Sequence, residues 1–88
     1  MKWDLNAAHK FSSHNREMLE KDSRCGCFYC KRVYEPKEIL QWIDNWGVTA
    51  RCAYCGIDSV IPESAGYPLN DEFLSAMYDK WFGTVYKK

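Results

Sequence analysis

The sequence has 88 residues, a length that suits one domain over residues 1–88 and is too short for two. Twelve lysine and arginine residues balance twelve aspartate and glutamate residues, and this zero net charge argues against general nucleic-acid binding because phosphate contacts need a positive surface. No apolar run approaches the roughly 20 residues of a membrane span, and the first residues carry no secretory signal, so we expect a cytoplasmic protein without a membrane partner.

The first third of the chain predicts one short helix behind a loosely held N-terminal arm. Residues 1–11 lack clear periodicity, although apolar side chains could dock them: Trp3, Leu5 and Phe11. Residues 13–22 predict a short helix with Ser13 as its N-cap. After the first cysteines, residues 31–34 favour a short strand.

A second helix is predicted over residues 36–46. Pro36 suits the first position of a helix, because the N–H that proline lacks has no partner there, and Gly47 ends the pattern. Four apolar residues between them fall at helical spacing: Ile39, Leu40, Ile43 and Trp46. We therefore expect an amphipathic helix in this segment.

The second half of the chain predicts a β-hairpin followed by a loop. Residues 48–52 and 57–62 are short and rich in β-branched side chains, and the sequence CAYCG lies between them at the expected tip. Residues 62–69 contain two prolines and a glycine, which is typical of a loop.

The last helix is predicted over residues 70–82 and has the clearest signals. Asn70 suits the N-cap and Gly83 suits the end of the helix. Apolar residues recur there as adjacent pairs at helical spacing: Phe73, Leu74, Met77, Tyr78, Trp81 and Phe82. Such a stripe most often packs into the core, and a groove-binding or dimer-forming face is the alternative.

Five cysteines give the strongest functional signal. An odd number cannot close into disulfides within one chain, and disulfides are rare in a reducing cytoplasm. Two C-x-x-C pairs are separated by 21 residues, close to the usual spacing of a zinc site. They predict one structural Zn²⁺ in a tetrahedral site with four ligands: Cys27, Cys30, Cys52 and Cys55.

The residues around these pairs leave alternatives open. Cys25 could replace Cys27 as a ligand, although the shorter loop from Cys27 matches the second pair. Gly56 would permit the positive φ of a knuckle turn and expose a backbone N–H to sulfur. Four cations flank the ligands and could offset the charge of the thiolates or, alternatively, form a phosphate-binding cluster: Arg24, Lys31, Arg32 and Arg51.

Several segments together resemble a family of small bacterial cytoplasmic proteins with a zinc-ribbon-like core. The segments are HNREML, CGCFYC, ILQWID, RCAYCGIDSVIP and F-L-x-x-M-x-x-x-W-F, and the resemblance covers residues 10–82. It implies a small zinc-bound α+β domain, in which two zinc knuckles and a short β-hairpin pack with about three helices. Ala53 departs from the proline often found inside such a knuckle. Such proteins also occur on mobile elements and phages, which suggests an inhibitor or accessory role by association alone.

A protein-binding or regulatory module with a structural zinc ion is the favoured function. Exposed aromatic residues are frequent at the centre of interfaces, and the candidates are Trp3, Trp42, Trp46, Tyr54 and Tyr67. The alternative is a nucleic-acid-binding ribbon, in which cations touch phosphate and aromatic rings stack on bases. Its candidate contacts are Lys31, Arg32, Arg51, Phe28, Tyr29 and Tyr54.

An enzyme is the least favoured class. Four cysteines fill the coordination of zinc, whereas a catalytic site keeps one position open. Redox chemistry is disfavoured because neither C-x-x-C pair is expected to open a helix in a βαβ unit. A metal-dependent nuclease would need histidines near or after the second pair, and only His9 and His14 occur, both upstream of the first pair. We expect polar, exposed or capping roles for them, rather than ligation or catalysis.

Overall fold

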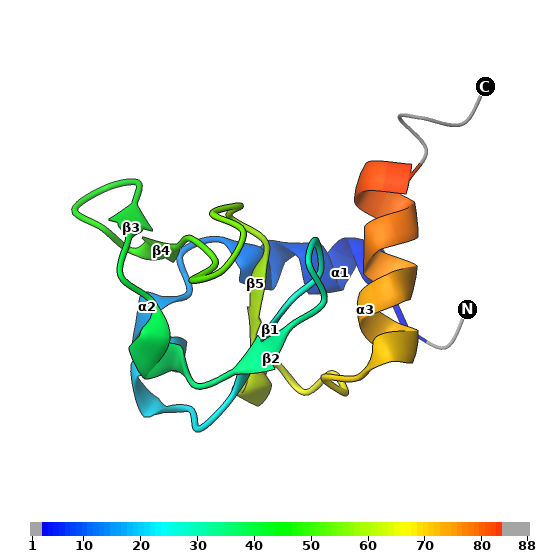
Figure 1. Cartoon of the computed structure of the whole chain (residues 1–88), viewed down its shortest axis with the longest axis horizontal. Helices are drawn as coiled ribbons and strands as arrows, with labels where there is room; N and C mark the ends of the chain where they lie inside the picture. The colour runs from blue at the N-terminus through cyan, green and yellow to red at the C-terminus, as the bar shows by residue number, and fades with distance from the viewer. Residues whose placement is uncertain (1–2, 84–88) are drawn as a thin grey trace.

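The computed structural model describes residues 3–83, which form short helices and two small antiparallel sheets (Figure 1). The α-helices are α1 (Leu5–His9), α2 (Arg16–Lys21) and α3 (Asp71–Tyr78). The strands are β1 (Cys25–Cys27), β2 (Val33–Tyr34), β3 (Trp42–Ile43), β4 (Thr49–Ala50) and β5 (Val60–Pro62). Short 3₁₀ segments follow at Lys10–Ser12, Pro36–Glu38 and Glu63–Ala65, and a π-helical turn covers Asp79–Gly83.

β1 is the central strand of the larger sheet, whose strand order is β2-β1-β5. Cys25 pairs with Tyr34 on one side and with Pro62 on the other, and Cys27 pairs with Val60. The smaller sheet pairs β3 with β4. Figure 1 shows this two-stranded sheet and α3 at opposite ends of the long axis of the molecule.

Within the arm expected over residues 1–11, residues 5–9 form α1 and a 3₁₀ segment follows, while residues 1–2 lie outside the described part of the chain. Asp4 caps α1, because its carboxylate accepts hydrogen bonds from the backbone N–H groups of Asn6 and Ala7. Leu5 is buried in the core, and Trp3 packs edge-on against Phe73. The apolar side chains thus dock this segment firmly, which the lack of sequence periodicity had obscured.

The helix predicted over residues 13–22 exists but starts later, at Arg16. Ser13 does not cap it, and Asn15 occupies the N-cap position without a capping hydrogen bond. The Asn15 side chain instead points inward, where its amide donates to the carbonyls of Phe11 and Val60, both at 2.9 Å. Its oxygen accepts from the backbone N–H of Ala50 at 3.1 Å. One buried side chain therefore connects three separate segments.

The amphipathic helix predicted over residues 36–46 is wrong. Only Pro36–Glu38 turns helically, as a 3₁₀ segment with a capping box between Glu35 and Glu38. The chain then extends into β3, so that apolar residues at helical spacing do not share one face. Leu40 is 87% exposed, whereas Ile39 is buried.

The β-hairpin predicted from residues 48–52 and 57–62 is also wrong. Both segments contain strands, but β4 pairs with β3, and β5 pairs with β1. The expected strand within residues 31–34 is confirmed as β2. The loop over residues 62–69 includes the 3₁₀ segment Glu63–Ala65.

The last helix follows the sequence closely. Asn70 accepts a hydrogen bond from the backbone N–H of Phe73 and caps α3, and the helical path ends at Gly83. Three residues of the apolar stripe are buried in the core, and Trp81 and Phe82 pack against it while partly buried. The buried cluster is made of Leu5, Ala8, Phe28, Ile61, Leu69, Phe73, Leu74 and Met77. A second buried cluster lies around the cysteines and includes Leu19, Cys25, Tyr34, Ile39, Ala50 and Val60.

Candidate metal centre

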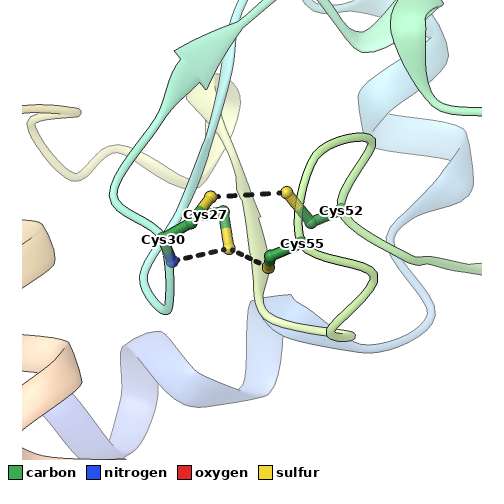
Figure 2. A group of neighbouring side chains, drawn as sticks. All are labelled: Cys27, Cys30, Cys52 and Cys55. Atoms are coloured by element: carbon green, nitrogen blue, oxygen red, sulfur yellow. Dashed lines mark hydrogen bonds between the residues drawn. The ribbon is translucent and has the colours of Figure 1, made fainter.

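Four cysteine side chains converge between two loops of the chain (Figure 2). Cys27 ends β1, and Cys30 lies in the turn after it. Cys52 and Cys55 lie in the turn between β4 and β5. The central strand of the larger sheet therefore delivers one half of the cluster, and the connection that leads back to that sheet delivers the other half.

The distances between the sulfur atoms fit a tetrahedral metal ion. The Sγ atoms of Cys27 and Cys55 are 3.6 Å apart, and those of Cys30 and Cys52 are 3.7 Å apart. All four lie within 4.8 Å of one another, and no disulfide joins any of the five cysteines in the described part of the chain. Four sulfurs at about 2.3 Å from one zinc ion would form a tetrahedron with edges of about 3.8 Å. The four cysteines can therefore hold a metal ion.

The two loops have the same backbone hydrogen bonds. In the first, the N–H of Lys31 donates to the carbonyl of Cys27 at 2.8 Å, and in the second the N–H of Gly56 donates to Cys52 at 3.0 Å. The N–H groups of the central tyrosines donate to sulfur: Tyr29 to Cys27 at 3.3 Å and Tyr54 to Cys52 at 3.4 Å. N–H groups that face a sulfur stabilise its negative charge. The backbone of each loop is therefore arranged to stabilise the thiolate of its own first cysteine.

Both knuckles end on a residue with left-handed backbone geometry. Gly56 has a φ of 79°, as the sequence suggested, and Lys31 has a φ of 67° at the equivalent position of the first knuckle. The N–H of Gly56 was expected to face a sulfur, but it donates to the Cys52 carbonyl instead. Ala53, where a proline was expected, uses its backbone N–H to donate to the Tyr34 hydroxyl at 3.1 Å.

Two buried hydroxyl groups border the sulfurs. Ser59 Oγ lies 3.0 Å from Cys27 Sγ. The Tyr34 hydroxyl lies at the second knuckle, where it accepts from the backbone N–H of Ala53, the residue after Cys52. Sequence reasoning missed both residues, although a signal exists: each carries a hydroxyl seven positions after the first cysteine of a pair, from Cys27 to Tyr34 and from Cys52 to Ser59.

The thiols of the cluster differ in proton affinity. Interaction with the Cys52 thiol raises the pKa of Cys27, and burial raises it further. The same interaction lowers the pKa of Cys52 to about 4. Burial raises the pKa of Cys55. Because a divalent ion needs thiolates as ligands, metal binding to this cluster would release protons and weaken as the pH falls.

Cys25 lies outside the group of four cysteines that could hold one ion. Its side chain is fully buried in β1, and its thiol donates a long hydrogen bond of 3.5 Å to the carbonyl of Tyr34. Burial raises the pKa of Cys25 to about 12, which describes a protonated core thiol rather than a reactive one.

No family model, curated protein or solved structure matches this chain. The resemblance to a family of small bacterial zinc-ribbon-like proteins therefore stays a prediction. We therefore infer its function from the cysteine site and from the exposed residues of the chain.

The four cations that flank the cysteines each have a local partner. Arg24 forms an ion pair with Glu63 at 3.5 Å, and Arg51 donates to Gln41 at 3.4 Å. Lys31 and Arg32 lie over aromatic rings, with the Lys31 ammonium 4.9 Å from the ring of Tyr78 and the Arg32 guanidinium 4.7 Å from that of Tyr54. The structure thus distributes these cations among separate contacts.

The aromatic candidates for partner binding differ widely in exposure. Trp3 and Tyr67 pack on Phe73, Trp42 lies under the Arg16 guanidinium at 4.6 Å, and Phe28 is buried in the core. Tyr29 packs against Phe82 but stays partly exposed. Tyr54 is 51% exposed, its hydroxyl donates to Glu38, and its ring packs on Tyr34. Trp46 is 98% exposed.

Neither histidine belongs to the group of side chains that could hold an ion. The ring of His9 packs on Trp81 with centroids 4.0 Å apart, and the backbone N–H of His14 donates to Thr49 at 2.8 Å. Neither C-x-x-C pair opens a helix, which is the context that redox chemistry would need. Among the described residues, no helix has the length and apolar character to cross a membrane.

Proposed function

We propose that this chain is a small protein-binding module of zinc-ribbon-like character, held by one structural Zn²⁺ at Cys27, Cys30, Cys52 and Cys55. The short distances between the four sulfur atoms support the metal site. Four thiolates in a tetrahedral arrangement favour zinc or an iron–sulfur centre among biological metals, and two C-x-x-C pairs at this spacing favour zinc. When bound, the ion would join the two knuckles and supply folding free energy to a domain with a small core.

The β3–β4 turn carries the proposed contact with a partner protein. Trp46 lies in this turn with its side chain 98% exposed, and its φ of 62° is an outlier for a bulky residue. A strained backbone that presents a large apolar side chain to solvent has no stabilising role within the chain, and strain of this kind gathers at binding sites. Exposed tryptophan is also the side chain most enriched at interface hot spots.

Leu40 is a second exposed apolar residue, at the end of the β3–β4 hairpin away from the turn. It is 87% exposed and lies just before β3, while Arg51, after β4, donates to the neighbouring Gln41. We infer a partner protein with an apolar pocket that accepts the Trp46 indole and an apolar rim that covers Leu40. Tyr29 and Tyr54 are secondary candidates for contact. An inhibitor or accessory role on a mobile element remains a prediction.

Nucleic-acid binding is the second candidate, and the contacts of its candidate residues favour it less. Phe28 is buried and unavailable for stacking, and Lys31 and Arg32 engage aromatic rings of the chain itself. With no excess positive charge, affinity for phosphate would be low. Retention on heparin at low salt would favour this alternative, and elution without retention would remove it. Catalysis is not proposed, because four cysteine ligands would leave zinc no open position.

A comparison of two variants tests the proposed interaction surface. Wild-type protein, Trp46→Ala and Val33→Ala are used as baits in extracts of the native host, and captured proteins are then purified and titrated against each variant. Val33 is a matched control because it is an exposed apolar residue on a different strand. We expect one direct partner to bind wild type and Val33→Ala and to bind Trp46→Ala at least ~30-fold more weakly, as for a hot spot of about 2 kcal/mol. Equal binding by all three proteins would contradict the proposal.

A further inference from the structure

Tyr34 and Ser59 occupy equivalent positions relative to the two knuckles. Tyr34 comes seven residues after Cys27, and Ser59 comes seven residues after Cys52. Each hydroxyl lies not at the knuckle that precedes it but at the other one: Ser59 Oγ lies 3.0 Å from Cys27 Sγ, and the Tyr34 hydroxyl accepts from the backbone N–H of Ala53, the residue after Cys52. The two contacts therefore cross between the halves of the cluster.

Ser59 contacts the first knuckle through both its side-chain hydroxyl and its backbone carbonyl. The Ser59 side chain is buried, with 1% exposed, and its Oγ lies 3.0 Å from Cys27 Sγ. The Ser59 carbonyl accepts a hydrogen bond from the backbone N–H of Phe28, the residue after Cys27, at 3.0 Å. A thiolate has no proton to give, so once Cys27 is ionised the hydroxyl can only donate to the sulfur.

Tyr34 is likewise buried and bonded to the backbone of the opposite knuckle. The Tyr34 side chain is 7% exposed, and its hydroxyl oxygen accepts from the backbone N–H of Ala53, the residue after Cys52, at 3.1 Å. With its oxygen accepting from this N–H, the hydroxyl keeps its own proton free to donate to a sulfur of the same knuckle. In both halves, then, a buried hydroxyl lies at the opposite knuckle while its residue accepts from the backbone N–H that follows the first cysteine there.

We infer that Tyr34 and Ser59 are positioning residues of the metal centre, each of which donates a hydrogen bond to the first thiolate of the opposite knuckle. This inference rests on the zinc site of the proposed function. Four thiolates around a divalent ion carry a formal charge of about −2, and hydroxyl donors draw electron density from the two most buried sulfurs. Because the donors cross, each knuckle also fixes the side-chain orientation of a ligand in the other.

Removal of the hydroxyls tests this inference with Co²⁺ as a spectroscopic probe. The full chain is titrated with Co²⁺ under reducing conditions, and the sulfur-to-cobalt charge-transfer band and the Kd are recorded for Tyr34→Phe, Ser59→Ala and the double variant. Ser12→Ala and Tyr67→Phe are matched controls, because the buried Ser12 hydroxyl donates to the His9 carbonyl and Tyr67 packs against the other core cluster. We expect each test variant to bind ~10-fold more weakly, the usual effect of losing a partner of a metal ligand.

The position of the band separates this inference from general loss of stability. A sulfur that loses a hydrogen-bond donor is more electron-rich, so its charge-transfer band should move to longer wavelength in the test variants and stay fixed in the controls. If Ser59→Ala does not fold, Ser59→Thr and Ser59→Val provide a pair of equal size that differs in the hydroxyl. Weaker binding by Ser59→Val alone supports the inference, and equal binding by both variants contradicts it.

Failure of this inference can be told apart from failure of the metal site. A wild-type protein that shows no sulfur–cobalt band would refute the zinc site itself. A wild-type protein with a strong band, whose position and Kd are unchanged in Tyr34→Phe and Ser59→Ala, would refute the role of the hydroxyls and leave the metal site intact.

Discussion

Lys31 occupies in the first knuckle the backbone position that Gly56 occupies in the second. Both N–H groups donate to the carbonyl of the first cysteine of their pair, and both residues have left-handed φ angles, of 67° and 79°. A glycine adopts this geometry without steric cost, whereas a lysine does not. The first knuckle is therefore the more strained of two loops that are otherwise alike.

Replacement of Lys31 by glycine should stabilise the metal-bound protein by up to about 1 kcal/mol, because the backbone strain is relieved. The gain is reduced by the loss of the contact between the Lys31 ammonium and the Tyr78 ring, an interaction of about 0.5 kcal/mol at an exposed site. Lys31→Ala isolates this loss, since alanine keeps the strain. Urea unfolding with zinc present measures all three proteins, and a Lys31→Gly variant no more stable than Lys31→Ala would contradict the argument.

The reverse kind of substitution, from glycine to a residue with a Cβ atom, tests the second knuckle. A Cβ atom added at Gly56 would meet no other atom within 4 Å, so Gly56→Ala should cost only the backbone term of about 1 kcal/mol. A much larger loss in urea unfolding would show that the second knuckle depends on more than the conformation of this residue.

Loss of the ion, or of one ligand, should unfold residues 25–61. Structural zinc supplies about 10–16 kcal/mol of apparent binding free energy, which matches or exceeds the total stability of a small domain. We expect chelator treatment and Cys55→Ser to abolish the cooperative melt seen by circular dichroism. Cys25→Ser, which changes a thiol outside the cluster, should retain one ion per chain by native mass spectrometry. Reduced protein that melts identically with and without chelator would contradict the zinc site.

Asn15→Ala should be among the most destabilising single changes outside the cysteines. The substitution removes three hydrogen bonds and leaves the carbonyls of Phe11 and Val60 and the N–H of Ala50 without their partner. Each buried polar group left unpaired costs about 1 kcal/mol or more, so the expected loss is roughly 3 kcal/mol. Denaturant unfolding measures it, and Asn6→Ala is a control, because the exposed Asn6 contributes only its backbone N–H to the cap of α1. A loss similar to that of the control would refute this role.

Glu38 should titrate at lower pH than an ordinary glutamate. The Tyr54 hydroxyl donates to its carboxylate, and this bond lowers the pKa of Glu38. A depressed folded-state pKa means that the bond stabilises the fold above the ordinary glutamate range and is lost as the pH falls through the lowered value. An NMR titration of the Glu38 carboxyl carbon should show its midpoint rise in Tyr54→Phe. An unchanged midpoint would rule out the hydroxyl as the cause.

The cluster of four cysteines could be predicted from the sequence because its chemistry is local. Each C-x-x-C pair forms one tight turn, and the structure indeed brings the four predicted cysteines together. The capped helix at the C-terminus was predictable for a similar reason, since Asn70 and Phe73 are neighbours on its first turn. In both cases the signal lies within a few residues of chain.

The middle of the chain could not be predicted in this way, because pairing between distant segments decides its structure. Ile39 and Leu40 fit a helical pattern, but Trp42 pairs with Ala50 and forces the segment to extend. The strand at residues 60–62 had an obvious neighbour in the segment before Cys52, yet it pairs with β1, more than 30 residues earlier. The contact of Ser59 with Cys27 depends on that pairing and was missed with it.

The division of the four clustered cysteines between two knuckles has a consequence for biosynthesis. Twenty-one residues separate Cys30 from Cys52, which corresponds to roughly one to four seconds of translation at about 5–20 residues per second. During that interval the first pair of thiols leaves the ribosome without its counterpart, and β1 waits still longer for Val60–Pro62. The nascent chain must therefore either hold an ion with two sulfurs or keep both thiols reduced until the second pair emerges.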